Sequence, residues 1–264
     1  MSSLVTAASL LGGCVTPTIV ATLEPAVVPA PLDVQLEINT GWRTLAPGLE
    51  QRIYRPQGAN ALTQFTAVRI DPAYYTFRVH YQPGQRRTVQ EWRSALPGAA
   101  VFVNANFFDP QGSPLGLVVS DGVTYGRSFQ GFGGFIQVKH GQVRVRSNIL
   151  EPFAGEPLEQ AVQAFPMLVT DGRASYFNTS GDRVSRRTVV GQDSAGRIIL
   201  LVSSSLVGMR LVDLSEYLPT SDLDLVNALN LDGGGSSLLA LNVPEPAQIP
   251  SFDPVPVVLA AYPR

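Results

Sequence analysis

The residues best suited to chemistry lie in the segment 230–237, which reads Asn-Leu-Asp-Gly-Gly-Gly-Ser-Ser and separates two apolar runs. Three successive glycines after a carboxylate leave bare backbone, so that peptide N–H groups can lie directly against a ligand. Such N–H groups can bind an anion, and Asp232 beside them could act as a nucleophile, a base or a metal ligand. A glycine-rich turn, with aspartate as the turn former, is the structural alternative.

A second polar segment, 104–109, has a similar character and reads Asn-Ala-Asn-Phe-Phe-Asp. Carboxamides donate and accept hydrogen bonds at once, which suits the hydroxyl groups of a sugar. Asn104 and Asn106 are two residues apart at the end of an expected strand, so they point to the same side. The neighbouring phenylalanines could stack on a sugar ring. Alternatively, they belong to the core and the asparagines to a turn.

Arginines offer the third kind of chemistry. Arg186 and Arg187 precede an apolar strand, and one of two consecutive strand residues points inward. An inward arginine beside the glycine loop would hold a phosphate or a carboxylate with paired hydrogen bonds. Two solvated surface charges are the ordinary alternative.

The composition excludes several other mechanisms. The chain of 264 residues has a formal net charge of −2, so no basic surplus indicates nucleic-acid binding. With two histidines and one cysteine it has no Cys/His zinc cage, no disulfide framework and no Cys–His nucleophilic pair. A Ser–His–carboxylate site would require His80 or His140. Both histidines are expected to be structural, one in a strand and one in a hairpin turn.

The N-terminal segment predicts export. Residues 4–11 are small and apolar, and Leu-Gly-Gly-Cys at 11–14 has the form of a bacterial lipoprotein cleavage box, which predicts lipidation of Cys14 and a membrane anchor. No lysine or arginine precedes the apolar run, and a lone buried cysteine in an ordinary apolar terminus is the alternative. Residues 15–31 are rich in proline and predict an extended tether. We expect the folded domain to occupy residues 32–264.

Alternating apolar residues predict strands at 32–38, 66–70 and 75–81, the last two as an antiparallel pair. Four X-Gly turns between apolar runs, at 121–122, 140–141, 171–172 and 195–196, predict β-hairpins. The capping box at 88–91 predicts a short helix that ends near residue 96. Further helices are expected at 211–218 and from 221 or 222 to 229. A strand is expected at 238–241 and an edge strand at 257–262. The fold class is therefore α+β, with a large mixed, mainly antiparallel sheet and few short helices.

Taken together, these segments resemble the phosphodiester glycosidases. The order and content of several motifs match over about residues 65–243, and the segment 230–237 is the most specific of them. The family often has Gly-Gly where this chain has Ala105 and Asn106, which leaves open whether Asn104 or Asn106 takes the role of the family's asparagine. The other matching segments are 104–109, 116–122 (Gly-Leu-x-x-x-Asp-Gly), 165–172 (Phe-Pro-Met-Leu-Val-x-Asp-Gly) and 187–191 (Arg-Thr-x-x-Gly).

The resemblance implies hydrolysis of a sugar-1-phosphodiester between the anomeric carbon and the phosphate oxygen. A carboxylate near the anomeric carbon stabilises the oxocarbenium-like transition state. The leaving group is a stable phosphate, which lowers the need for a strong general acid. We assign Asp232 as the key carboxylate and Asp109 as the second. The phosphate is assigned to Arg187 and the amides of Gly233, Gly234 and Gly235, and the sugar to Asn104, Asn106, Ser236 and Ser237.

The expected substrate is a glycan or glycosyl phosphate of the cell envelope. No cofactor is required by this chemistry, although a divalent cation remains open. Two alternative functions stay open. One is a surface-tethered glycan-binding protein without turnover, and the other is a metal-dependent phosphodiesterase that uses Asp232 and Asp109 as ligands.

Overall fold

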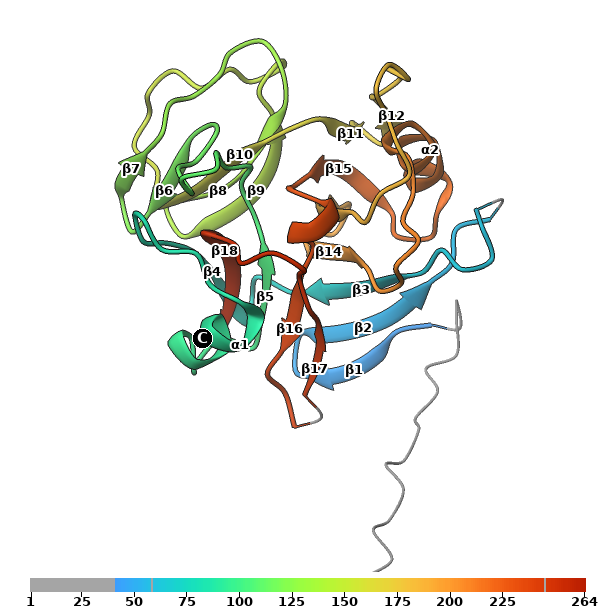
Figure 1. Ribbon diagram of the computed structural model, residues 1–264, viewed down its shortest axis with the longest axis horizontal. Coiled ribbons are helices and arrows are strands. Elements are labelled where there is room, and N and C mark those ends of the chain that lie inside the picture. The colour runs from blue at the N-terminus through green and yellow to red at the C-terminus, as the bar shows by residue number, and fades with distance from the viewer. Residues whose placement is uncertain (1–40, 58, 245) are drawn as a thin grey trace, which may run out of the picture. The chain divides into compact units, whose positions relative to one another are not determined.

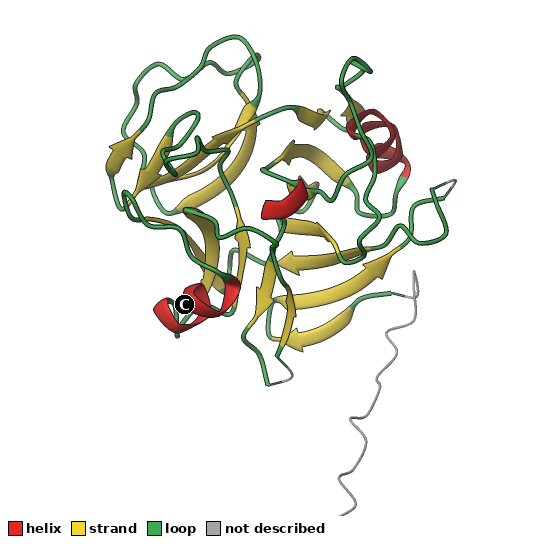
Figure 2. Cartoon of the chain, in the orientation of Figure 1, coloured by secondary structure: helices red, strands yellow, loops and turns green. Residues whose placement is uncertain are grey.

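The computed structural model describes residues 41–57, 59–244 and 246–264. The predicted strand at 32–38, the lipobox-like segment with Cys14 and the proline-rich tether lie outside the described residues. So does the start of the predicted domain. Within the described part, strands and loops predominate and helices are few and short (Figure 2).

An eight-stranded antiparallel sheet forms the larger part of the fold (Figure 1). Its order is β1-β2-β3-β14-β13-β15-β11-β12. The strands are β1 (Arg43–Ala46), β2 (Leu49–Tyr54), β3 (Phe65–Ile70), β11 (Met167–Thr170), β12 (Arg173–Ala174), β13 (Thr188–Asp193), β14 (Ile198–Ser203) and β15 (Leu225–Asn230).

Two five-stranded antiparallel sheets complete the fold, in the orders β7-β6-β10-β8-β9 and β17-β16-β5-β18-β4. The first contains β6 (Val118–Ser120), β7 (Val123–Tyr125), β8 (Gly134–Lys139), β9 (Gln142–Ser147) and β10 (Gln160–Ala164). The second contains β4 (Tyr75–Tyr81), β5 (Val101–Asn104), β16 (Leu239–Leu241), β17 (Ala247–Ile249) and β18 (Val257–Pro263).

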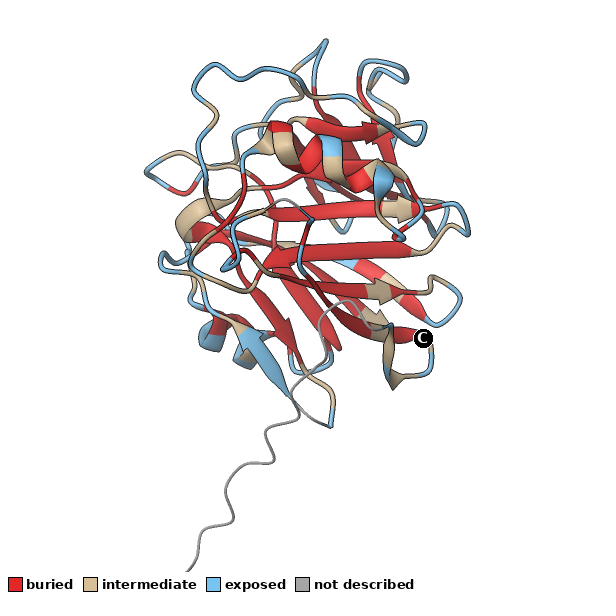
Figure 3. Ribbon diagram, turned by 90° about the vertical axis from the view of Figure 1, so that its right-hand side faces the viewer, coloured by how far each residue is buried: buried red, intermediate tan, exposed pale blue. Residues whose placement is uncertain are grey.

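The main hydrophobic core lies between the three sheets, and side chains such as Ile70, Val103 and Ile136 enter it from one sheet each. The buried strands are visible in Figure 3. Helix α2 (Leu211–Tyr217), followed by the 3-10 turn η1 (Leu218–Thr220), covers the outer face of the eight-stranded sheet. Helix α1 (Val89–Ala95) covers the outer face of the sheet that contains β5.

Predictions that depend only on residues adjacent in the sequence are confirmed. All four X-Gly turns join adjacent strands, and Asp121, His140 and Asp171 have the positive φ angles that such tight turns require. Thr88 and Glu91 form the capping box, so α1 begins where it was expected. The helix at 211–217 and the α+β class, with mainly antiparallel pairing, are also confirmed.

Three predictions, one about the type of an element and two about strand pairing, are wrong. The expected helix at 221–229 is instead strand β15, which lies between β13 and β11. Asp224 has a φ of 54°, which interrupts a right-handed helix, and the short apolar run satisfies its backbone through the neighbouring strands. The run at 257–262 is central between β5 and β4, not at an edge. Strands β3 and β4 belong to different sheets and do not pair.

Helix α1 also anchors the chain just before β18. The indole N–H of Trp92 donates to the carbonyl of Val255 (3.0 Å), and Arg87 and Val255 exchange two backbone hydrogen bonds. Trp92 is buried, so this contact is shielded from water. The segment that leads into β18 is therefore fixed by the helix.

We expect Trp92→Phe to lower the free energy of unfolding by roughly 1–3 kcal/mol, because a buried hydrogen bond and part of a buried ring are lost. Chemical denaturation followed by circular dichroism measures this change. Thr88→Ala, which removes only the cap, should cost about 1 kcal/mol. An unchanged midpoint for Trp92→Phe would contradict the anchoring role.

Candidate active site

The two polar segments singled out in the sequence lie side by side. Strand β5 ends at Asn104, whose side-chain N–H donates to the carbonyl of Asp232 (2.6 Å). The side-chain oxygen of Asn104 accepts from the Thr188 hydroxyl (2.7 Å) and from the Leu238 N–H (3.0 Å). In addition, the Asp232 N–H donates to the carbonyl of Ala105 (3.0 Å). The end of β5 therefore holds the glycine loop at several points.

Hydrogen bonds from its own loop orient the carboxylate of Asp232. The N–H of Gly233 donates to it (2.9 Å), and the hydroxyl of Ser236 bonds to it as well. Ser236 closes the 3-10 turn η2 (Gly234–Ser236), so the turn presents its hydroxyl to the carboxylate. Burial, assisted by the charge of Asp253, raises the pKa of Asp232 above its ordinary value of 3.8. The hydrogen bonds from Ser236 and Gly233 lower the pKa and oppose this shift.

Two of the three glycine amides are not free for an anion. The Gly233 N–H bonds to Asp232, and the Gly234 N–H donates to the carbonyl of Arg186 (2.8 Å). The prediction that all three glycine amides bind a phosphate is therefore wrong for Gly233 and Gly234, because these two N–H groups bond within the protein.

The predicted phosphate clamp, Arg187, is engaged elsewhere. Its guanidinium bonds to Asp182 (3.1 Å) and to the carbonyls of Arg183 (2.6 Å) and Met209 (2.8 Å). Instead, the arginine that contacts the glycine loop is Arg186. Its Nη2 donates to the carbonyls of Ser237 (3.0 Å) and Pro250 (3.0 Å). Both arginines are largely buried, and the one that contacts the loop is Arg186 in place of the assigned Arg187.

Arg186 is buried, and its guanidinium lies over the ring of Phe252 (4.7 Å to the ring centroid). Within the described part of the chain its Nε and Nη1 have no hydrogen-bond partner, and no carboxylate pairs with it. Burial lowers the pKa of Arg186. The guanidinium of Arg186 is therefore buried beside the loop, and it joins the loop to the segment of Pro250 and Phe252.

The other predicted residues divide into two groups. Asn106 is buried near the loop and donates to the carbonyl of Gln163 (2.8 Å), and its Oδ1 has no hydrogen-bond partner among the described residues. Ser237 is also buried with an unpartnered hydroxyl. Asp109, by contrast, accepts from the N–H groups of Gln111 (2.9 Å) and Ser113 (2.8 Å) and closes a turn. One oxygen of Asp109, Oδ1, therefore stabilises a local turn, and its role as a second carboxylate stays a prediction.

A cluster of four phenylalanines lies beside Asn106. Phe107 stacks on Phe165 (4.6 Å between ring centroids), and Phe129 stacks on Phe132 (4.4 Å). Phe165 and Phe132 meet edge to face and both remain partly exposed. The backbone of Phe165 accepts from the side chain of Asn230 (2.9 Å), which links this cluster to the glycine loop. Exposed ring faces at this place suit contact with a sugar.

The two histidines lie where the sequence predicts them, His80 in strand β4 and His140 in the turn between β8 and β9. His80 bonds through Nε2 to the Tyr262 hydroxyl (2.8 Å). Burial, assisted by the charge of Arg78, lowers the pKa of His80 to about 4. In the described ranges, no group of three or more His, Cys, Asp or Glu side chains is placed to hold a metal ion.

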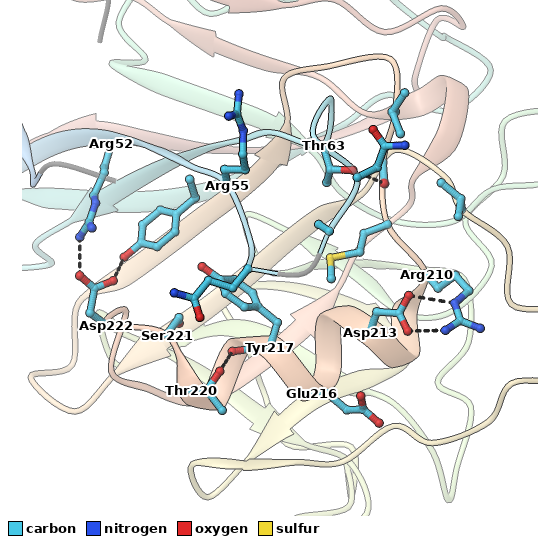
Figure 4. Close-up of a pocket in the computed structure, with 18 residues that line it drawn as sticks. Arg52, Arg55, Thr63, Arg210, Asp213, Glu216, Tyr217, Thr220, Ser221 and Asp222 are labelled. Carbon is cyan, nitrogen blue, oxygen red and sulfur yellow. Dashed lines mark hydrogen bonds and ion pairs between the residues drawn. The ribbon is translucent and has the colours of Figure 1, made fainter. Parts of the chain in front are cut away.

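A large cavity, of about 720 Å³, lies away from the glycine loop, between β2 and α2 (Figure 4). There Asp222 accepts from the Tyr54 hydroxyl and from Arg52 (2.7 Å). Burial raises the pKa of Tyr217, which lines the same cavity, to about 12. None of the predicted site residues lines this cavity.

Sequence reasoning missed two residues at the loop. Asn230 is buried at the end of β15 with its Oδ1 unpartnered, although it belongs to the motif itself. Asp253 lies beyond the motif in a proline-rich stretch, and nothing in its spacing marks it. Only the folded chain brings Asp253 to Gly235.

Comparison with known proteins shows the family of this chain. The family profile "Phosphodiester glycosidase" matches residues 97–262, more than half of the chain. The chain belongs to the phosphodiester glycosidase family. The matched residues include β5, the glycine loop and Asp253.

Two curated relatives are N-acetylglucosamine-1-phosphodiester alpha-N-acetylglucosaminidases. The mouse protein is 30% identical over 188 residues and the bovine protein 30% over 187 residues, each match covering 60% of this chain. The chain spans about a third of the length of these relatives (34%). The catalytic domain of the zebrafish enzyme shares the fold, with a TM-score of 0.64 and 21% identity over 84% of this chain and 86% of that one.

We expect Asn104→Ala to destabilise the protein by at least about 2 kcal/mol, because the Thr188 hydroxyl, the Leu238 N–H and the Asp232 carbonyl each lose a buried partner. Urea denaturation measures this. Asn106→Ala, which removes one such bond, should cost less. Equal costs for the two variants would show that Asn104 does not hold the loop.

Asp232→Asn should raise the melting temperature at pH 7. The pKa of Asp232 is higher in the folded than in the unfolded chain, so ionisation of this group costs stability as the pH rises above 3.8. Asparagine keeps an acceptor for the Gly233 N–H and carries no charge. Calorimetry at pH 7 and pH 3 tests this, and the gain should vanish at pH 3. A gain of the same size at both pH values would contradict the electrostatic cause.

Proposed function

We propose that this protein hydrolyses glycosyl-1-phosphodiesters, with Asp232 as the carboxylate at the anomeric carbon. The observation that carries this is the position of Asp232, held by Gly233, Ser236 and Asn104, in a chain of the phosphodiester glycosidase family. A side chain fixed on both its backbone and its carboxylate is preorganised for charge that develops in the transition state.

The chemistry follows from the charge distribution. When the bond between the anomeric carbon and the phosphate oxygen breaks, positive charge spreads over the ring oxygen and the anomeric carbon. The ionised carboxylate of Asp232 stabilises that charge directly. The departing phosphate is a stable anion, so no histidine is needed to protonate it.

The substrate is proposed to be a sugar whose C1 phosphate is esterified to a second group. The phenylalanine cluster and the buried asparagines beside the loop suit a sugar ring and its hydroxyl groups. The curated relatives are named for N-acetylglucosamine, which makes N-acetylglucosamine-1-phosphodiesters the first substrates to test.

Asp232→Asn should lower kcat/KM by at least about 10²-fold, since a transition-state charge loses its partner. In the pH profile of kcat/KM for the wild type, the acid limb should lie above pH 3.8, because Asp232 with its raised pKa ionises only at a higher pH. Assays with N-acetylglucosamine-1-phosphodiesters in ¹⁸O-labelled water measure both. Label in the sugar confirms cleavage at the anomeric carbon. Label in the phosphate, together with loss of activity on chelation, would instead indicate a metal-dependent phosphodiesterase.

We further propose that the protein is exported and anchored through a lipid on Cys14, and that it acts on glycans of the cell envelope. The cleavage-box pattern at 11–14 and the proline-rich stretch after it support this. No helix in the described ranges is both long and apolar enough to cross a membrane.

In a bacterial host, the full chain should incorporate a labelled fatty acid and sediment with membranes. Cys14→Ser should lose the label and appear in the soluble fraction, because the thioether bond to the lipid cannot form. Fractionation and fluorography check this. Identical labelling of the variant would contradict the anchor at Cys14.

A further inference from the structure

The segment that links β17 to β18 crosses directly beside the glycine loop (Figure 1). The N–H groups of Phe252 (2.7 Å) and Asp253 (3.2 Å) both donate to the carbonyl of Gly235. Asp253 is thus placed next to the turn that holds Asp232. The charge of Asp253 adds to the effect of burial in raising the pKa of Asp232.

Gly235, the third glycine of the loop, lies in close contact with Asp253. A Cβ atom built on Gly235 would lie 2.1 Å from Oδ2 of Asp253, far inside van der Waals contact. The φ angle of Gly235 is not in the left-handed region, so backbone conformation alone does not require glycine there. The space that a side chain at position 235 would occupy is instead taken by the carboxylate of Asp253, which is the end of an exposed side chain.

Both ends of this segment are fixed. On one side Arg186 donates to the Pro250 carbonyl and lies over the Phe252 ring. On the other side Val255 is held by Trp92 and by the backbone of Arg87. Asp253 itself remains exposed to solvent between these anchors. A rigid backbone that carries an accessible carboxylate is the arrangement that a general base needs.

We propose that Asp253 is the second carboxylate of the active site and acts as the general base on the attacking water. This rests on the proposed glycosidase function. Glycoside hydrolysis commonly uses two carboxylates, and Asp109, the other candidate from the sequence, is engaged in its own turn.

In the proposed step, the water oxygen forms a bond to the anomeric carbon and gives its proton to the carboxylate of Asp253. The bond between the anomeric carbon and the phosphate oxygen breaks, and its electron pair leaves with the phosphate monoester. If Asp232 first forms a covalent glycosyl intermediate, the same base activates the water that releases the sugar. Among the described residues, Asp232 and Arg186 are charged residues on segments that contact the segment of Asp253, whereas the guanidinium of Arg87 bonds to Gln82 and Gln85.

The test compares Asp253→Asn and Asp253→Ala with the wild type on the glycosyl-1-phosphodiester used above, and Asp171→Asn, an exposed turn residue, is the control. We expect kcat/KM to fall about 10²- to 10³-fold for the Asp253 variants and to be unchanged in the control. Azide, a nucleophile that needs no base, should restore turnover of Asp253→Ala as glycosyl azide. In Asp253→Asn the acid limb should move to lower pH, since a like charge near Asp232 is removed.

Gly235→Ala supplies a second, independent measurement. In the wild-type background its methyl group should displace the Asp253 carboxylate and lower kcat/KM at least about tenfold. In the Asp253→Ala background, where the collision is absent, it should have little further effect. Additive losses would overturn the contact.

The outcomes separate the two proposals. A wild-type protein that hydrolyses the substrate together with an Asp253→Asn variant that retains its activity would overturn the role of Asp253 alone. Loss of activity with neither azide rescue nor a shifted acid limb would reduce Asp253 to a structural role and also overturn it. A wild-type protein that hydrolyses no glycosyl-1-phosphodiester would overturn both proposals.

Discussion

The site depends on one carboxamide. Asn104 ends β5, a central strand of one sheet, and holds the loop that carries the chain from β15 of another sheet to β16. Backbone groups in such a crossing have no ladder partners, so they must be satisfied by other means. Asn104 donates to Asp232 and accepts from Thr188 and Leu238, which are groups from both sheets. The position of Asp232 is therefore a consequence of how two sheets are joined.

The cost of this arrangement is visible in the buried polar atoms. Of the eight buried side-chain atoms without a hydrogen-bond partner in the described part of the chain, five belong to Asn106, Arg186, Asn230 and Ser237. Each buried atom of this kind costs roughly 1–3 kcal/mol. Their concentration around one loop is typical of a site kept for binding and catalysis at the expense of stability.

Local signals in the sequence were sufficient for the hairpins, for the capping box of α1 and for the α2 helix, because each depends on a few adjacent residues. Strand partners depend on distant residues, so the sequence predicts a helix where β15 lies and an edge strand where the central β18 lies. The glycine motif identified Asp232, and the β5 motif identified its neighbours. The choice between Arg186 and Arg187 requires the facing direction of a strand, which two adjacent arginines do not reveal. Asp253 lies in a stretch without any motif, so only the fold brings it to the loop.

The run of three glycines can now be explained residue by residue. A Cβ on Gly233 would lie 2.8 Å from the carbonyl oxygen of Arg186, and one on Gly235 would collide with Asp253. Gly234 has a φ of 60°, which side chains rarely adopt. Each glycine thus answers a different constraint. Removing three side chains lets the segment before β13 and the segment before β18 approach the same loop. A chain with two histidines and one cysteine builds its candidate site by this close approach of backbone, and the groups proposed to react are carboxylates.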